Sequence, residues 1–161
     1  MSLDNIAIAA GVSKPTIYRR WPGKADLATA ALRSFQMAEP PVNTGSTPGD
    51  LTATLENLSR SLLRRNGMSL IGTVLAEEAH TDELLSLFPE RLVAPRRQMF
   101  RVILERAKKN GELRRGANLD AAINFLIGAL YARYLANSAV PADFPRELVK
   151  LIWPGLARTS R

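Results

Sequence analysis

The sequence predicts an all-α fold with a small N-terminal head and a larger helical body. Apolar residues recur at helical spacing wherever the chain is periodic. No segment shows the strict apolar–polar alternation between turn residues that indicates a β-strand. A stretch rich in Pro, Gly, Ser and Thr, AEPPVNTGSTPGD, has the composition of a connector. We therefore expect a head at residues 1–37, a linker at 38–49 and a body at 50–161.

Three short helices are expected in the head. The first is predicted at residues 3–10, and Gly11 follows it at a point where the chain needs a positive φ. Ser13 is placed to cap a second helix, which ends at Pro22. A third helix is predicted at residues 25–37.

The body is predicted to be entirely helical. Asn110 and Gly111 form its clearest stop signal. Pro95 is expected to kink a helix or to mark the start of a new one, and Pro154 to end or bend the last helix. The expected helices span residues 50–66, 69–79, 81–88, 90–110, 119–137 and 145–157.

Composition excludes several classes of protein. The chain has 161 residues and no cysteine, so disulfides, thiolate metal sites and cysteine nucleophiles are not available to it. No run approaches the roughly 18 consecutive apolar residues of a membrane span, and the N-terminus lacks the layout of a signal peptide. We therefore expect a cytoplasmic protein with no membrane partner.

Positive charge is concentrated near the N-terminus. The formal net charge is +7, and residues 1–35 hold five Lys or Arg against two acids. Residues 3–27, LDNIAIAAGVSKPTIYRRWPGKADL, are typical of a helix-turn-helix, whose second helix enters the DNA major groove. A one-sided excess of positive charge on this short segment favours a polyanionic partner.

Helical rotation assigns the faces of the second helix. One side is predicted to pack inward, through Ile17 and Trp21, on Ile6, Ala10 and Val12. The opposite side is predicted to face the groove, and the flanks to meet phosphate oxygens. The groove side holds Pro15, Thr16 and Arg19, and the flanks hold Tyr18 and Arg20. The alternative is that these polar residues form an ordinary solvated face.

The same segment resembles the DNA-binding signature of the TetR family of transcriptional regulators. The resemblance rests on GVSKPTIY at residues 11–18, on RRW at 19–21 and on KADL at 24–27. It implies base-facing roles for Lys14, Pro15, Thr16 and Arg19. It implies phosphate-facing roles for Tyr18 and Arg20, and for Lys24 at the start of the next helix. The DNA-binding residues that it implies are Ser13, Lys14, Pro15, Thr16, Tyr18, Arg19, Arg20 and Lys24.

One feature of the family pattern is not found in the sequence. In the family, an amphipathic helix of about two dozen residues precedes the motif and covers its apolar side. Here the sequence begins almost at the motif. From the sequence we expect either a wrongly placed start codon or a truncated head. Such a head is shorter than about 40 residues, the length below which domains seldom fold alone.

The last two predicted helices carry more apolar surface than one neighbour can cover. Such helices are buried on two sides, and a two-fold four-helix interface between copies of the chain explains the excess. A simple buried core helix is the alternative. The predicted dimer residues are Ile123, Ile127, Leu130, Tyr134, Leu148, Ile152 and Leu156.

A ligand pocket is expected between the body helices, but spacing alone does not separate pocket residues from core residues. The candidates are Leu75, Phe88, Met99, Phe100, Ile103 and Phe125, and none is assigned to a ligand. His80 lies among acidic residues, and a solvated helix end explains that cluster better than a metal site. No cofactor and no metal is expected.

The resemblance implies a ligand-responsive repressor, in which a homodimer binds a palindromic double-stranded operator and releases it when a small molecule binds the body. The first alternative is a helical dimeric small-molecule-binding module without DNA binding. The second is an enzyme, which the sequence supports poorly because it holds no catalytic triad, phosphate loop or paired metal ligands.

Overall fold

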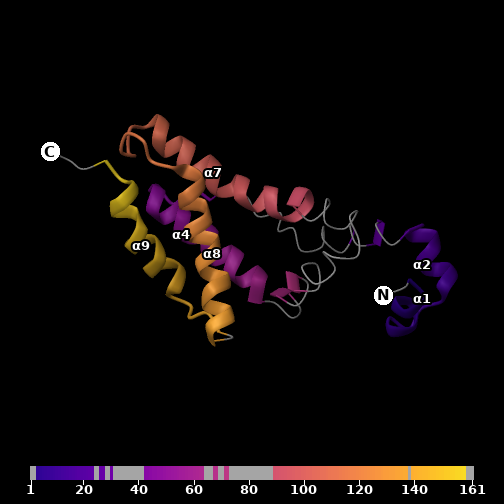
Figure 1. Cartoon of the computed structure of the whole chain (residues 1–161). Helices are drawn as coiled ribbons and strands as arrows, with labels where there is room; N and C mark the ends of the chain where they lie inside the picture. The colour runs from indigo at the N-terminus through magenta and orange to yellow at the C-terminus, as the bar shows by residue number, and fades with distance from the viewer. Residues whose placement is uncertain are drawn as a thin grey trace. The chain divides into compact units, whose positions relative to one another are not determined.

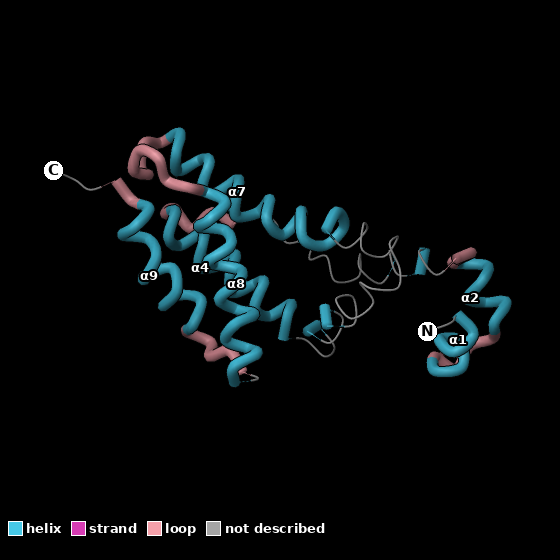
Figure 2. Tube along the Cα trace, in the orientation of Figure 1, coloured by secondary structure: helices cyan, strands magenta, loops and turns pink. Residues whose placement is uncertain are grey.

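The computed structural model describes residues 3–23, 26–27, 30, 42–63, 67–68, 71–72, 89–137 and 139–158. The chain forms two compact units, one of Met1–Met37 with Ser69–Ala94 and one of Ala38–Met68 with Pro95–Arg161. Within the described ranges every secondary-structure element is a helix apart from one isolated bridge, so the predicted all-α class is confirmed (Figures 1 and 2). An isolated antiparallel bridge joins Leu113 to Ala157.

In the first unit, helices α1 (Leu3–Ala9) and α2 (Lys14–Arg20) pack against each other. The turn between them places Gly11 at a φ of 65°, a conformation that glycine adopts without steric cost. The amide of Val12 then donates to the carbonyl of Ala7 at 3.0 Å, which closes the C-terminus of α1. The predicted helix–Gly turn–helix is present.

The core of this helix pair differs in part from the predicted one. Ile17 is buried, and the half-buried Ile6 and Trp21 pack beside it, as predicted. Ala10 and Val12 were expected in the same core but lie exposed, because α1 ends at Ala9 and the turn carries both residues outward. Their places are taken by two residues from the first turns of α1, Leu3 and Ala7.

In the second unit, α4 (Thr47–Leu63), α8 (Leu119–Asn137) and α9 (Phe144–Leu156) pack on one another (Figure 1). The side of α4 that faces the core shows helical spacing, which explains why it is buried along its whole length. That side consists of Leu51, Leu55, Leu58 and Leu62. Helix α7 (Ala94–Lys109) adds Phe100, Ile103, Leu104 and Ala107 to the buried residues.

Two prolines behave as their chemistry requires. Pro95 was expected to kink a helix or to start one, and the structure confirms a start. A five-residue π-helical turn spans Pro89–Val93, and α7 begins directly after it, at Ala94. Pro95 therefore lies in the first turn of α7, where its missing N–H would have had no partner within the helix. Pro154 lies inside α9, which ends two residues later. The helices expected at 25–37, 69–79 and 81–88 fall largely outside the described residues.

A buried carboxylate secures the segment that leads into α4. Asp50 is only 1% exposed and accepts hydrogen bonds from Thr44, at 2.6 Å from its backbone N–H and at 2.8 Å from its hydroxyl. Arg106 of α7 forms an ion pair with the second carboxylate oxygen. Because a buried charge is tolerated only when it is paired and hydrogen-bonded, this network ties α4, α7 and residues 42–46 together.

Candidate nucleic-acid interface

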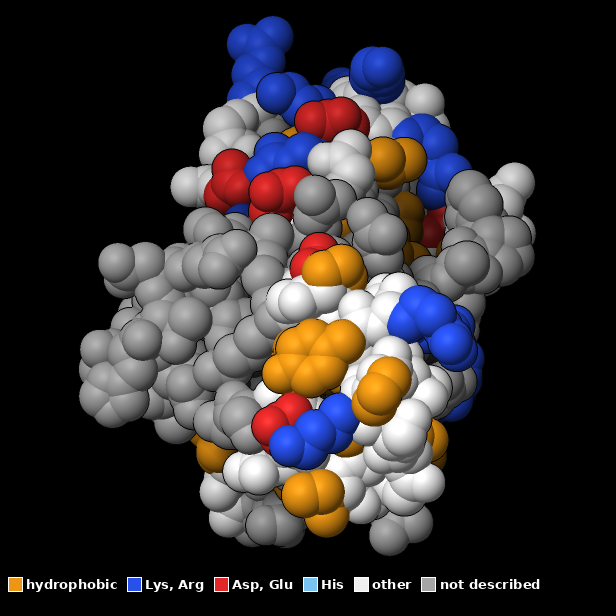
Figure 3. Space-filling view, turned by 90° about the vertical axis from the view of Figure 1, so that its right-hand side faces the viewer, with side chains coloured by type: hydrophobic (Ala, Val, Ile, Leu, Met, Phe, Trp, Pro, Cys, Tyr) orange, Lys and Arg blue, Asp and Glu red, His pale blue; other side chains and the backbone are white. Residues whose placement is uncertain are grey.

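Helix α2 presents one polar and basic face to solvent. Pro15, Thr16 and Arg19 are exposed on it, and Ile17 on the opposite side is buried. No acidic residue occurs within α2. On the face of the molecule that Figure 3 shows, basic side chains lie beside hydrophobic and acidic ones. These residues are therefore exposed or buried as predicted, and the groove-facing role of the exposed side stays a prediction.

An acidic residue of α1 contacts two side chains of α2. The Nζ of Lys14 lies 2.7 Å from Oδ2 of Asp4, and the hydroxyl of Tyr18 donates to Oδ1 of the same carboxylate at 3.4 Å. The hydrogen bond with Lys14 holds the pKa of Asp4 below its usual value and raises the pKa of Lys14. Two of the residues expected to bind DNA are thus held by one carboxylate.

Sequence reasoning missed Asp4. It precedes Lys14 by ten residues and lies across a turn, so the i,i+4 spacing that reveals pairs within one helix does not apply. The available signal was that Asp4 is the one acid between residues 1 and 25.

Ser13 occupies the N-cap position of α2 with the extended backbone typical of a cap, φ −70° and ψ 146°. Its side chain makes no capping hydrogen bond to the backbone. Instead, its Oγ lies 2.8 Å from Oγ1 of Thr16, and the amide of Thr16 donates to the carbonyl of Ser13 at 3.0 Å. Two exposed hydroxyls are therefore held together at the start of α2, where polar side chains and helix N–H groups suit an anion.

At the other end of α2, the guanidinium of Arg20 lies over the ring of Trp21, 5.1 Å from its centroid. This cation–π contact restrains the long side chain of Arg20. The N–H groups at the edge of the guanidinium can still donate to a phosphate. Tyr18 is exposed on the other flank. Lys24, the remaining expected contact, lies outside the described residues.

The residues expected to form a dimer interface fall into two groups. Ile123, Leu130 and Leu156 are buried within the single chain, so they have little surface left to cover. The other four are half-buried, namely Ile127, Tyr134, Leu148 and Ile152. The exposed large apolar residues of the same two helices are Phe125, Leu135 and Leu151.

The residues considered for a ligand pocket also separate. Met99 and Ile103 line a pocket between α4 and α7. Phe100 is fully buried in the core, and Phe125 is exposed. Leu75, Phe88 and His80 lie outside the described residues.

Neither a metal site nor a membrane-spanning helix is found in the part of the chain that the structure describes. No three or more His, Asp or Glu side chains cluster there as metal ligands would. No described helix is long and apolar enough to cross a bilayer.

Two family models match the chain. Residues 1–31 match the model described as "Bacterial regulatory proteins, tetR family", and residues 41–152 match "Tetracyclin repressor-like, C-terminal domain". The second match covers more than half of the chain.

Similar proteins carry related descriptions. The HTH-type transcriptional regulator YdeS of Bacillus subtilis is 30% identical over 99% of this chain and 81% of its own length. A DNA-binding transcriptional repressor TetR of Mycobacteroides abscessus is 33% identical over 74% of this chain and 62% of its own. The crystal structure of FadR from Bacillus subtilis, in complex with stearoyl-CoA, superposes with a TM-score of 0.76 at 17% identity, covering 96% of this chain and 88% of FadR. The chain belongs to the TetR family of transcriptional regulators.

Proposed function

We propose that the chain is a ligand-responsive repressor that binds a near-palindromic operator as a homodimer and releases it when a small molecule binds the second unit. The exposed basic face of α2, free of acids within the helix, carries this proposal. Lys14, Thr16 and Arg19 are the residues assigned to base edges, where Arg donates in pairs to guanine. The protein acts in the cytoplasm, where operator DNA lies, and as a regulator rather than an enzyme.

The flanks of α2 are assigned to the DNA backbone. Tyr18 offers a hydroxyl and Arg20 a guanidinium, and such contacts position a recognition helix without reading sequence. Ser13 and Lys24 complete this set, at the start of α2 and beyond its end. Contacts to phosphate make affinity fall steeply with salt, because each neutralised phosphate releases condensed counterions.

A homodimer through α8 and α9 is supported by the exposed side of α8. Phe125, Gly128, Ala132 and Leu135 follow one another at helical spacing, and all are exposed and without charge. Leu151 of α9 is 78% exposed. Contiguous apolar surface of this kind marks protein–protein contacts, and a two-fold axis would place the same surface of a second copy on it.

The half-buried residues of these helices fit the edge of such an interface. They are Ile127, Tyr134, Leu148 and Ile152. A dimer would present two copies of α2 about one DNA turn apart, roughly 34 Å, which is the spacing of operator half-sites. Ligand binding that changes this spacing would break the contacts of one head at a time.

Two similar proteins support the proposals that the chain represses transcription and that it responds to a ligand. The similar protein of Mycobacteroides abscessus is described as a repressor, and the FadR structure contains stearoyl-CoA. We assign repression and a small-molecule effector to this chain by that similarity. The identity of the effector is not carried over, because FadR is only 17% identical.

The test is a titration of the full chain with DNA from around its own gene, at low and at moderate salt, in the presence and absence of competitor DNA. The proposal expects sequence-selective binding whose affinity falls linearly on a logarithmic salt scale. Absence of binding at every salt concentration would overturn it and favour a dimeric ligand-binding module.

A further inference from the structure

Five basic residues gather in the second unit where α7 ends and the residues after α9 return to it. Two lie in the last turn of α7 and two in the loop that follows, within the segment KKNGELRR at residues 108–115. The fifth comes directly after α9. All five are exposed. We call this surface the basic corner, and it consists of Lys108, Lys109, Arg114, Arg115 and Arg158.

Backbone hydrogen bonds hold the basic corner together. The amide of Arg158 donates to the carbonyl of Glu112 at 2.6 Å, and the amide of Arg114 donates to the carbonyl of Leu156 at 2.9 Å. The Nε of Arg114 also donates to the carbonyl of Gly155, at 2.6 Å. Cations that are far apart in the sequence are thus fixed beside one another. Because the loop is already ordered, a partner that binds here has less conformational entropy to remove.

The charge of the basic corner is not balanced by acids. None of the five cations forms an ion pair with a described residue. Glu112 lies in the same loop but is half-buried, and its carboxylate accepts from the hydroxyl of Thr47, at 2.7 Å, and from the amide of Asn110, at 3.0 Å. Glu105, one turn before Lys109, is exposed and forms no ion pair with the residues that the structure describes. Like charges that gather without acids repel one another, so an anionic partner would relieve a cost to the fold.

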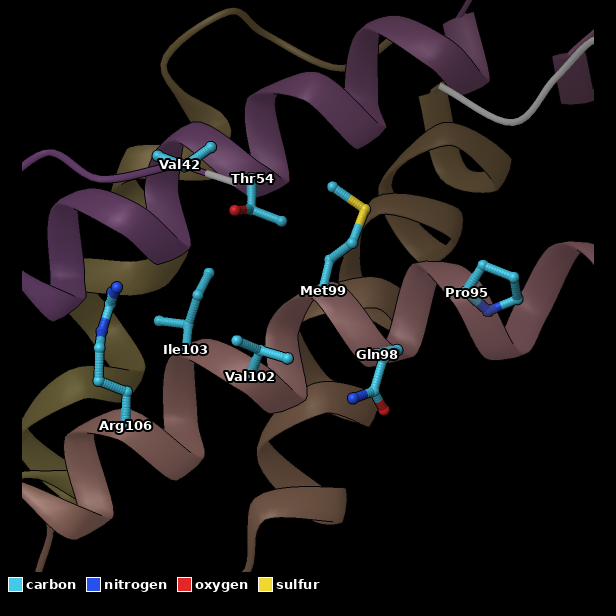
Figure 4. A pocket seen from close by; sticks show the side chains of 8 residues that line it. All are labelled: Val42, Thr54, Pro95, Gln98, Met99, Val102, Ile103 and Arg106. Atoms are coloured by element: carbon cyan, nitrogen blue, oxygen red, sulfur yellow. The ribbon is translucent and has the colours of Figure 1, made fainter. Parts of the chain in front are cut away.

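The arginines earlier in α7 differ from the basic corner in this respect. Arg106 extends toward α4 (Figure 4) and pairs with Asp50. Arg97 and Arg101 both pair with Asp120 of α8. These three arginines are matched by acids of the second unit, whereas the basic corner is open to an acid from outside.

The composition of the basic corner selects among anionic partners. Residues 108–116 include no aromatic side chain on which a base of a single-stranded nucleic acid could stack. Their one large apolar residue, Leu113, is only 8% exposed and is not available to enter a lipid surface. Duplex DNA is read by a helix or strand that follows a groove, and the basic corner is a loop. Carboxylates on a short peptide suit it best, because three of the five cations are arginines, whose planar N–H groups match a carboxylate with two hydrogen bonds.

We propose that the basic corner binds an acidic segment of a partner protein, a short stretch with several Asp or Glu residues. Its carboxylates pair with the guanidinium groups of Arg115 and Arg158 and with the outer N–H groups of Arg114. Lys108 and Lys109 add positive charge that steers the segment toward the loop. This binding does not depend on the DNA-binding role proposed for α2.

Two labelled peptides test the charge that the basic corner accepts. Decaglutamate and its neutral counterpart decaglutamine are titrated with the full 161-residue chain, and fluorescence anisotropy gives the dissociation constants at low and at moderate salt. We expect decaglutamate to bind at least about tenfold more tightly than decaglutamine at low salt, with a smaller ratio at moderate salt, because exposed charges are screened. Equal binding of the two peptides, or no binding of decaglutamate, would overturn the proposal.

Two double charge reversals locate the binding surface. Lys109→Glu with Arg115→Glu alters the basic corner, and Arg19→Glu with Arg20→Glu alters the net charge by the same amount on α2. The first pair should weaken decaglutamate binding at least about tenfold and leave DNA binding unchanged, and the second should do the reverse. An equal loss of peptide affinity in both would show that the peptide responds to net charge alone. Lys109→Gln with Arg115→Gln should give a smaller loss in the same direction, so the test does not depend on the folding of one variant.

Duplex DNA and lipid are compared in the chain that carries Arg19→Glu and Arg20→Glu. At moderate salt, decaglutamate should bind it more tightly than a random duplex or a phosphatidylserine vesicle does. Tighter binding of the duplex that is lost on further reversal of Lys109 and Arg115 would assign the basic corner to nucleic acid, and the same result with the vesicle would assign it to lipid. Either result would overturn the proposal.

Discussion

Lys14 of α2 and Asp4 of α1 form an ion pair, with the Nζ of Lys14 2.7 Å from Oδ2 of Asp4. Tyr18 donates to the other oxygen of the same carboxylate. A carboxylate and a phosphate offer the same kind of oxygen acceptor to a lysine. In the DNA-binding role proposed for α2, Asp4 therefore competes with DNA for two side chains, Lys14, which is assigned to base edges, and Tyr18, which is assigned to the backbone.

The first prediction concerns this competition. Asp4→Asn should tighten binding to all DNA sequences by about two- to fivefold, because an exposed ion pair is weak but must be given up on binding. The logarithmic salt slope should also become steeper, because the positive charge of Lys14 is then no longer balanced by Asp4 where α2 meets the DNA. Fluorescence anisotropy on operator and random duplexes at several salt concentrations gives both quantities. Glu105→Gln, the same change of charge on the exposed side of α7, is the control. Weaker binding by Asp4→Asn would instead identify Asp4 as a residue that positions Lys14.

The second prediction concerns Asp50 and pH. Burial raises the pKa of Asp50, whereas the hydrogen bonds from Thr44 and the charge of Arg106 lower it, and the balance leaves the pKa below 3.8. A carboxyl group whose pKa is lower in the folded state stabilises the fold above its unfolded pKa. That contribution is lost as the pH falls through the folded pKa.

Asp50→Asn should therefore lower the free energy of unfolding at pH 7 by about 1–3 kcal/mol, the cost of losing a charge-assisted hydrogen bond in a buried site. The difference in the free energy of unfolding between the wild type and the variant should shrink as the pH falls below 3.8, because the wild-type carboxyl is then protonated and uncharged like the amide. Urea unfolding followed by circular dichroism between pH 7 and pH 3 measures it, with Glu105→Gln as the control. A deficit of the same size at both ends of this range would show that the charge of Asp50 is not the cause.

The third prediction concerns the dimer. Leu151→Glu places a charge on the exposed apolar side of α9 and should raise the dissociation constant of the dimer by at least about tenfold. Light scattering across a dilution series measures the change. Ile8→Glu is the matched control, because Ile8 of α1 is 73% exposed, close to the 78% of Leu151, but lies outside α8 and α9. If the two variants dissociate equally, or neither does, the interface has been assigned to the wrong helices.

The helical periodicity of the sequence predicted which residues of α2 are buried and which are exposed. The burial of Ile17 and the exposure of Pro15, Thr16 and Arg19 follow from one helical rotation, because α2 is short, regular and charged on a single side. The burial of Ala10 was wrongly expected, since the end of α1 depends on where the turn begins and not on apolar spacing.

The body was harder to predict. Helix α8 is apolar over most of its circumference, so the sequence indicated burial on two sides without saying which residues face α4 and α9. The structure places Ile123 and Leu130 inside and leaves Phe125 and Leu135 exposed. The Asp50–Arg106 pair spans 56 residues, a separation for which no local pattern exists.

The most direct test of the central claim, that α2 is the recognition helix of a DNA-binding regulator, is a competition assay with single-base variants of the operator. Arg19→Ala should lose about 1–3 kcal/mol of discrimination at particular base pairs. Arg20→Ala should weaken all sequences alike. Arg115→Ala, an exposed arginine of the second unit, is the control and should do neither. Selective binding that survives Arg19→Ala and Arg20→Ala unchanged would contradict the account, because the operator would then be read by another part of the chain.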